Sequence, residues 1–134
     1  MKKISTLAIL LLAISLISVA QQAVPAIQWS KCFGGSLEER GHSIASTTDG
    51  NFVIVGEAWS NDGDLAGNIS NGRVNVWVIK IDSAGNLLWQ KTYGGSSWDM
   101  GRFITATPDG GSIFVAHTLS NDGQVSGYHG SWDI

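Results

Sequence analysis

Two similar polar stretches carry residue types that could bind a metal ion. Residues 60–68 read SNDGDLAGN, and residues 120–128 read SNDGQVSGY. In the first stretch, Asp62 and Asp64 have the alternate spacing of a calcium-binding loop. The next alternate position is an alanine, and Arg73 stands where such a loop supplies its bidentate glutamate. Asp62 and Asp64 are therefore weak calcium candidates, and no other cofactor is expected.

The second stretch favours a structural interpretation of both. Gln124 replaces Asp64 there, so one hard ligand is lost. The stretches share Ser-Asn-Asp-Gly and a later glycine, at Gly67 and Gly127. A tight turn uses these residue types for side-chain to backbone hydrogen bonds and for positive φ. We expect each stretch to connect repeat units, with calcium binding as the alternative for the first.

Acidic residues follow a Gly-Gly-Ser turn in both halves of the chain: Glu38 and Glu39 in the first, Asp99 in the second. A glycosidase needs two carboxylates placed across a sugar. Glu39 and Asp99, however, occupy equivalent repeat positions, so we expect them to accept hydrogen bonds from loop amides. The three histidines do not recur, and nucleophile and phosphate-loop motifs are absent from the sequence. We assign no catalytic residue and expect that the protein is not an enzyme.

The six tryptophans fall into two groups. Indole rings can stack on sugars, so a tryptophan outside the core is a candidate ligand contact. Three stand at repeated positions or in an apolar strand and are expected in the core: Trp29, Trp77 and Trp89. Three do not recur and are the candidates for a surface ligand contact: Trp59, Trp98 and Trp132.

An internal repeat supplies the elements that must position these residues. Residues 29–67 align with residues 89–127 at a constant offset of 60, with 16 identities in 39 positions and no gap. The copies then slip by two residues, which places Asp133 and Ile134 opposite residues 75 and 76. The repeat predicts two similar structural units in tandem over residues 21–134.

The apolar segments predict strands, because they are short, rich in Val, Ile, Phe and Trp, and bounded by glycine turns. In the second unit we expect four strands, at residues 74–82, 87–95, 102–107 and 112–118. The first unit supplies a hairpin over residues 43–58, preceded by a strand over residues 26–35 that matches the second of these four. A type I turn followed by a glycine at positive φ is expected in each TDGN or PDGG hairpin.

The fold class expected is all-β, with four-stranded repeats of the β-propeller type. Residues 52–56 and 76–79 are continuous apolar runs, which indicates strands buried on both faces, as in stacked blades. About one and three-quarter blades are present, whereas a closed ring takes about four to eight. A β-sandwich is the alternative architecture.

These motifs resemble a family of secreted bacterial β-propeller-like repeats. The resemblance rests on the patterns WVxKxD, WxKxYGGS, TxDGG and SNDGD, and it covers nearly all of the chain after residue 20. It implies an extracellular or cell-surface protein of a Gram-negative bacterium. With no catalytic residues assigned, we expect a non-enzymatic binding or scaffold module whose partner is an unknown protein or glycan. DSAGNLLW, residues 82–89, also loosely resembles the tryptophan-docking repeats of quinoprotein dehydrogenases. A fragment of a catalytic or cofactor-binding propeller is therefore the alternative function.

Residues 1–20 are expected to be a cleaved signal peptide. Lys2 and Lys3 precede an apolar run, and small residues at Ser18 and Ala20 fit a cleavage site. An uncleaved anchor is the alternative, but the run is short for a bilayer. Cleavage takes the net charge from −3 to −5, so neither nucleic acid nor an anionic membrane is an expected partner. The single cysteine, Cys32, is expected to be a small buried residue.

Because the predicted repeat units do not make a closed ring, we have two further expectations. The chain is expected to be a fragment of a longer protein, with assembly of copies into a ring as the alternative. In either case its open sheet faces and edges predict self-association.

Overall fold

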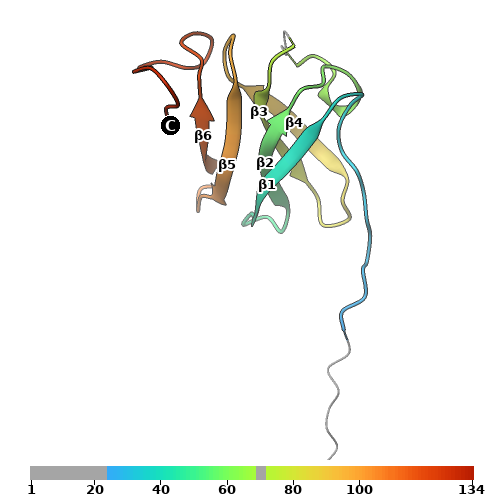
Figure 1. Cartoon of the computed structure of the whole chain (residues 1–134). Coiled ribbons are helices and arrows are strands. Elements are labelled where there is room, and N and C mark those ends of the chain that lie inside the picture. Colours follow the sequence, from blue (N-terminus) through green and yellow to red (C-terminus); the bar gives the residue numbers. More distant parts are fainter. Residues whose placement is uncertain (1–23, 69–71) are drawn as a thin grey trace, which may run out of the picture.

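Two antiparallel sheets form the fold in a computed structural model, which describes residues 24–68 and 72–134 (Figure 1). The predicted signal peptide lies outside the described residues. Four strands form the first sheet in the order β1-β2-β3-β4, and β5 and β6 form the second. The strands are β1 (Glu39–Ser46), β2 (Phe52–Ala58), β3 (Asn75–Ile81), β4 (Leu87–Tyr93), β5 (Asp99–Ala106) and β6 (Ser112–Thr118), with one short 3₁₀ helix, η1 (Gly63–Leu65). The all-β prediction is confirmed.

Tight hairpins join the strands within each sheet. Gly50 and Gly110 have φ angles of +77° and +88°, and each donates its amide to the carbonyl of the threonine three residues earlier, at 3.1 Å. These are the predicted turns with a glycine in the left-handed region. The β3–β4 turn uses Gly85 in the same way, with φ of +77°.

The sheets divide the chain at a different point from the predicted unit. The first sheet contains the last two strands of one sequence copy and the first two of the next. The prediction that the four strands from residue 74 onward form one unit is therefore wrong, because β3 and β4 belong to the first sheet and β5 and β6 to the second. The longer Gly-Gly-Ser connection after Tyr93 carries the chain out of the first sheet. Gly94, with φ of +149°, makes that bend possible.

The strand predicted at residues 26–35 is absent, and this prediction is wrong. Its counterpart β4 pairs with β3, whereas no described strand pairs with residues 26–35. Side chains hold the segment instead. Trp29 Nε1 donates to the Ser83 carbonyl and Lys31 Nζ to Asn86 Oδ1, both at 2.9 Å. The Trp29 ring lies over Gly85, where a β-carbon would approach it to 2.8 Å.

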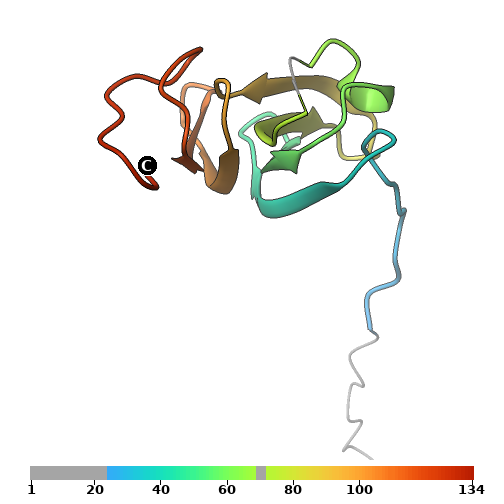
Figure 2. The same ribbon diagram turned by 45° about the horizontal axis from the view of Figure 1, so that its top comes forward.

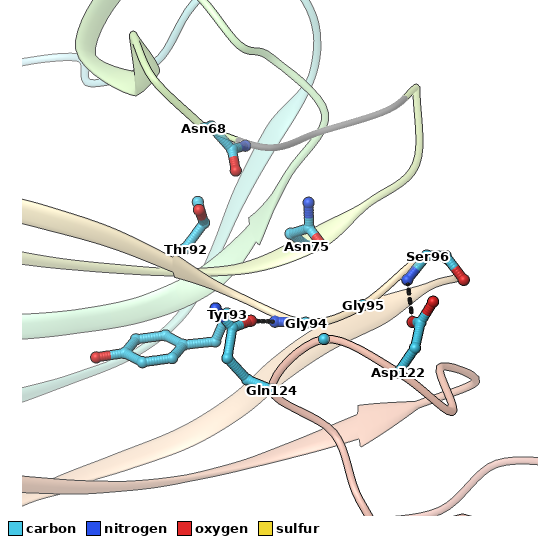
Figure 3. Close-up of a pocket in the computed structure, with 10 residues that line it drawn as sticks. Asn68, Asn75, Thr92, Tyr93, Gly94, Gly95, Ser96, Asp122 and Gln124 are labelled. Carbon is cyan, nitrogen blue, oxygen red and sulfur yellow. Dashed lines mark hydrogen bonds between the residues drawn. The ribbon is translucent and has the colours of Figure 1, made fainter.

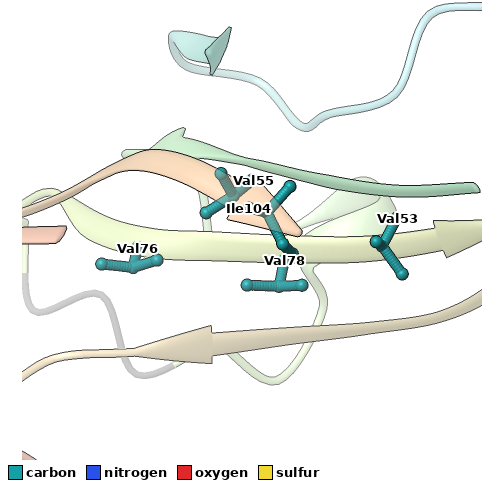
Figure 4. Packing of buried hydrophobic residues seen from close by; sticks show 5 residues of the cluster. All are labelled: Val53, Val55, Val76, Val78 and Ile104. Atoms are coloured by element: carbon teal, nitrogen blue, oxygen red, sulfur yellow. The ribbon is translucent and has the colours of Figure 1, made fainter. Parts of the chain in front are cut away.

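The main core lies between the two sheets, where β5 packs across β1, β2 and β3. Its buried members are valines of β2 and β3 and one isoleucine of β5: Val53, Val55, Val76, Val78 and Ile104 (Figure 4). A second cluster covers the opposite face of the first sheet, where Leu65 of η1 and Phe33 pack on Trp77, Ile79 and neighbouring residues. The prediction that the central strands are buried on both faces is confirmed for β2 and β3.

Three predicted core residues lie at the surface. Trp29 and Trp89 are 38% and 43% exposed, while Trp77 is buried as expected. Cys32 is exposed and free. Trp89 is exposed because it lies on β4, the edge strand of its sheet. Trp29 and Cys32 are exposed because they lie in the extended segment that no sheet covers.

The second sheet has two strands, and neither sheet closes on itself (Figure 2). Beyond β6, Thr118 forms an isolated antiparallel bridge with Asp133. Its counterpart in the first sheet is the pair Ala58 and Asn75. The alignment of Asp133 with Asn75 is thus matched by the backbone pairing.

Candidate functional site

The SNDG loops lie at one end of both sheets, where β2 and β6 end and β1 and β5 begin; this is called the loop end (Figure 1). In the first copy, Asp62 Oδ1 accepts from the Ser36 amide at 2.8 Å, and Asp64 Oδ2 accepts from the Gly34 amide at 3.0 Å. Ser60 Oγ accepts from the Leu37 amide at 2.8 Å. The loop therefore clasps the Gly-Gly-Ser turn that precedes β1.

The second copy repeats this clasp bond for bond. Asp122 Oδ1 accepts from the Ser96 amide at 2.6 Å, and Ser120 Oγ from the Ser97 amide at 3.0 Å. Gln124 replaces Asp64, yet its Oε1 accepts from the Gly94 amide at 3.0 Å. An amide and a carboxylate can both serve here because the turn requires only an acceptor.

The calcium candidates Asp62 and Asp64 thus each use one carboxylate oxygen to accept a hydrogen bond from a backbone amide. The amide of Ser36 holds the pKa of Asp62 below its ordinary value, and Ser96 does the same for Asp122. Among residues 24–68 and 72–134, no group of three or more metal-ligating side chains is brought together. The arrangement favours the connecting-turn interpretation.

Glu39 and Asp99 accept hydrogen bonds from loop amides, as predicted. Glu39 binds the amides of Gly35 and Ser60, both at 3.0 Å. Asp99, which is 1% exposed, binds the Gly95 amide at 2.9 Å and the Ser120 hydroxyl at 2.7 Å. It also accepts a hydrogen bond from the Thr118 hydroxyl. Each carboxylate ties its strand to both parts of the clasp, while Glu38 instead pairs with Arg40 at 2.6 Å.

A cavity of about 210 Å³ opens beside the second clasp (Figure 3). Amide side chains and the glycine turn line it, including Asn68, Asn75 and Gln124. Figure 3 shows the Gln124 side chain beside Gly94 and the Asp122 carboxylate beside Ser96, so both are engaged in the clasp. The remaining polar lining offers neutral donors and acceptors, which suit a hydroxylated ligand better than a charged one.

The topology brings the three candidate ligand contacts to the loop end. Trp59 directly follows β2, Trp98 directly precedes β5, and Trp132 precedes Asp133, which pairs with the last residue of β6. Trp98 and Trp132 are 40% and 46% exposed. Trp59 is half-buried, with the Arg40 guanidinium 5.4 Å from its ring centre. The Trp132 ring lies 6.3 Å from the ring of His117.

A cluster of charges around Glu57 was missed by sequence reasoning. Glu57 is 1% exposed, and its Oε1 lies 3.4 Å from Arg40 Nη1 and 3.5 Å from His42 Nε2. Arg102 reaches Oε2 from β5, at 3.9 Å. A buried carboxylate requires charged or hydrogen-bonding partners, and the guanidinium groups of Arg40 and Arg102 supply the positive charge here. The signal lay in the repeat alignment, where Glu57 stands opposite His117 and His42 stands opposite Arg102.

Comparison with protein-family models and with curated proteins finds no match for this chain. Over the described ranges 24–68 and 72–134, no helix has the length and apolar character needed to span a membrane.

Proposed function

We propose that this chain is an exported repeat protein of the β-propeller type, in which the β1–β4 sheet corresponds to one blade and β5–β6 to the inner half of the next. It acts as a non-enzymatic binding module at the cell surface. The order β1-β2-β3-β4, with each strand beside its sequence neighbour, supports this correspondence, as does the packing of β5 across the first sheet.

The proposal rests on one observation: polar residues that recur in both repeats bind the loops, and tryptophans that do not recur lie at the same end of the sheets. Side chains that recur in both copies, such as Asp62 and Asp122, hold the loops in place. The tryptophans that do not recur gather at the same end of the sheets, on the frame that the clasps make rigid. Exposed aromatic rings on a rigid frame are typical of glycan-binding and protein-binding surfaces.

A glycan is the ligand class that best suits this end. Trp98 and Trp132 offer indole faces for the apolar side of a pyranose ring, and the amide-lined cavity offers neutral partners for hydroxyl groups. The mature charge of −5 excludes an electrostatic basis for binding an acidic polymer.

A glycan array with the wild-type chain and two variants, Trp98→Ala and Trp132→Ala, tests the proposal. We expect binding to at least one glycan class, reduced about tenfold or more in either variant, the range for an aromatic anchor. Trp89→Ala is the matched control, because Trp89 is equally exposed but lies towards the opposite end of the sheet. Binding that the control weakens as much as the two variants, or no binding at all, would contradict a glycan site at the loop end.

A further inference from the structure

The outward face of the β5–β6 sheet carries uncovered apolar side chains. Phe103, Ile113 and Val115 are 58%, 61% and 45% exposed. Ile113 and Val115 stand sixty residues after Val53 and Val55, which are 1% and 0% exposed in the core between the sheets. The same positions are thus covered in the first sheet and bare in the second.

On the outer face of the first sheet, the residue of the first repeat is exposed and its counterpart in the second repeat is buried. Ile44 of β1 is 59% exposed, whereas its repeat counterpart Ile104 of β5 is 1% exposed. Ile104 is buried because it packs on Val53 and Val55 (Figure 4). Ile44 therefore lacks the pair of valine-like side chains that its counterpart contacts.

A pair of equivalent glycines supports the same conclusion. At Gly101, a β-carbon would lie 2.4 Å from Val55 Cγ2 and 2.7 Å from the Gly56 carbonyl oxygen, so the packing of the two sheets requires glycine. At Gly41, the nearest atom to such a β-carbon is Ile54 Cγ2, at 3.8 Å. Within the described structure, no atom approaches Gly41 as Val55 approaches Gly101.

The space beside Gly41 is a cavity of about 200 Å³ on the outer face of the first sheet. Its walls include Phe33, Ile54, Trp77 and Ile79, and it is mainly apolar. The position of this cavity is the one that the Val55 side chain fills at Gly101. A valine presented on the same kind of strand would fit it.

We propose that this chain associates head to tail with a second copy of itself. The β5–β6 face with Ile113 and Val115 packs on the β1–β2 face of the second copy, with Val115 against Gly41 and Ile113 near Ile44. The contact repeats the one already present between the two sheets of a single chain. Each copy keeps one free face of each kind, so the association continues into a ring or an open filament.

Charge pairing differs between the internal contact and the proposed one. Inside the chain, Arg102 of β5 reaches Glu57 of β2. In the proposed contact between two molecules, His117 of the first molecule takes the position that Glu57 has inside the chain. His42 of the second molecule takes the position of Arg102. Apolar contacts therefore carry the association, and we expect raised salt to leave it unchanged or to strengthen it.

Two variants of the full chain, one for each face, test the proposal by sedimentation. Val115→Asp places a charge on the first face, and Gly41→Val fills the cavity on the second. Both sites are open to solvent or to the cavity in a single copy, so circular dichroism should show wild-type folding. We expect the wild type to sediment as multiples of the 14.2 kDa chain and each variant alone as a monomer.

Mixing the two variants distinguishes head-to-tail association from any other kind. Val115→Asp keeps a working Gly41 face, and Gly41→Val keeps a working Val115 face, so the mixture should form a dimer and nothing larger. A monomeric wild type, whose faces would then serve a different protein, would overturn the proposal. So would variants that assemble like the wild type, or a folded mixture that stays monomeric.

Discussion

Identical residues in the two sequence repeats of one chain lie in opposite environments. Val55 and Ile104 are buried against each other between the sheets, while their counterparts Val115 and Ile44 are 45% and 59% exposed on the two outer faces. The loop clasps, in contrast, follow the same hydrogen-bond pattern in both repeat copies, with Gln124 as the acceptor in place of Asp64. Each clasp is thus formed within its own repeat copy, whereas the apolar faces pack together once, between the sheets, and leave apolar side chains exposed on both outer faces.

The largest effect should come from the two equivalent glycines. Gly101→Val would drive a side chain into Val55 and the Gly56 carbonyl, and we expect it to lower the free energy of unfolding by about 3 kcal/mol or more. Gly41→Val should cost less than about 1 kcal/mol, because its side chain enters the open cavity. Urea unfolding at low protein concentration, where association does not contribute, measures both. Equal losses would show that the two sites do not differ as described.

The next effect compares the two carboxylates that hold the clasps. Asp99→Ala leaves two hydroxyls and one amide without their acceptor in a buried site, and we expect a loss of about 3 kcal/mol. Glu39→Ala removes two amide hydrogen bonds at a half-buried site and should cost about 1–2 kcal/mol. Urea unfolding of both variants gives the difference, and a larger loss for Glu39→Ala would contradict this account.

A smaller effect is expected from trimming the equivalent valines. Val55→Ala should lower the free energy of unfolding by about 2 kcal/mol, because it removes buried methyl groups and leaves a cavity. Val115→Ala should change it by less than about 0.5 kcal/mol in the monomer, where the side chain is exposed. Comparable losses would mean that the outward face of β6 is already covered.

Sequence reasoning succeeded where one segment carries its own signal. The apolar runs of β2 and β3 predicted strands buried on both faces, and the DG turns predicted the hairpins and their left-handed glycines. It failed where burial depends on a neighbour. Trp89 repeats Trp29, yet Trp89 is exposed because β4 is an edge strand, and Trp29 is exposed because its segment joins no sheet; no local pattern encodes either. The cluster around Glu57 joins residues from β1, β2 and β5, so only the packing of the sheets brings it together.

The smallest effect is the acid sensitivity of the clasps. Amide hydrogen bonds lower the pKa of Asp62 and Asp122 in the folded state. A lowered folded-state pKa contributes stability above the ordinary carboxyl value of about 4, and this contribution is lost as the pH falls below it. Thermal melts from neutral pH to pH 3 should therefore show a shallower fall in Tm for Asp62→Asn and Asp122→Asn than for the wild type. A parallel fall in all three would mean that the clasp aspartates are not linked to acid unfolding.

Disulfide trapping tests most directly whether the open faces complement each other. Cys32→Ser first removes the exposed native thiol. One batch then carries Gly41→Cys and another Val115→Cys, and the two are mixed under mild oxidation. The close approach of Val55 to Gly101 inside the chain places the new sulfurs within bonding reach across the proposed contact. We predict a cross-linked dimer in this mixture and none when Leu88→Cys, on exposed β4, replaces Val115→Cys. No cross-link, or equal cross-linking in the control, would contradict the account.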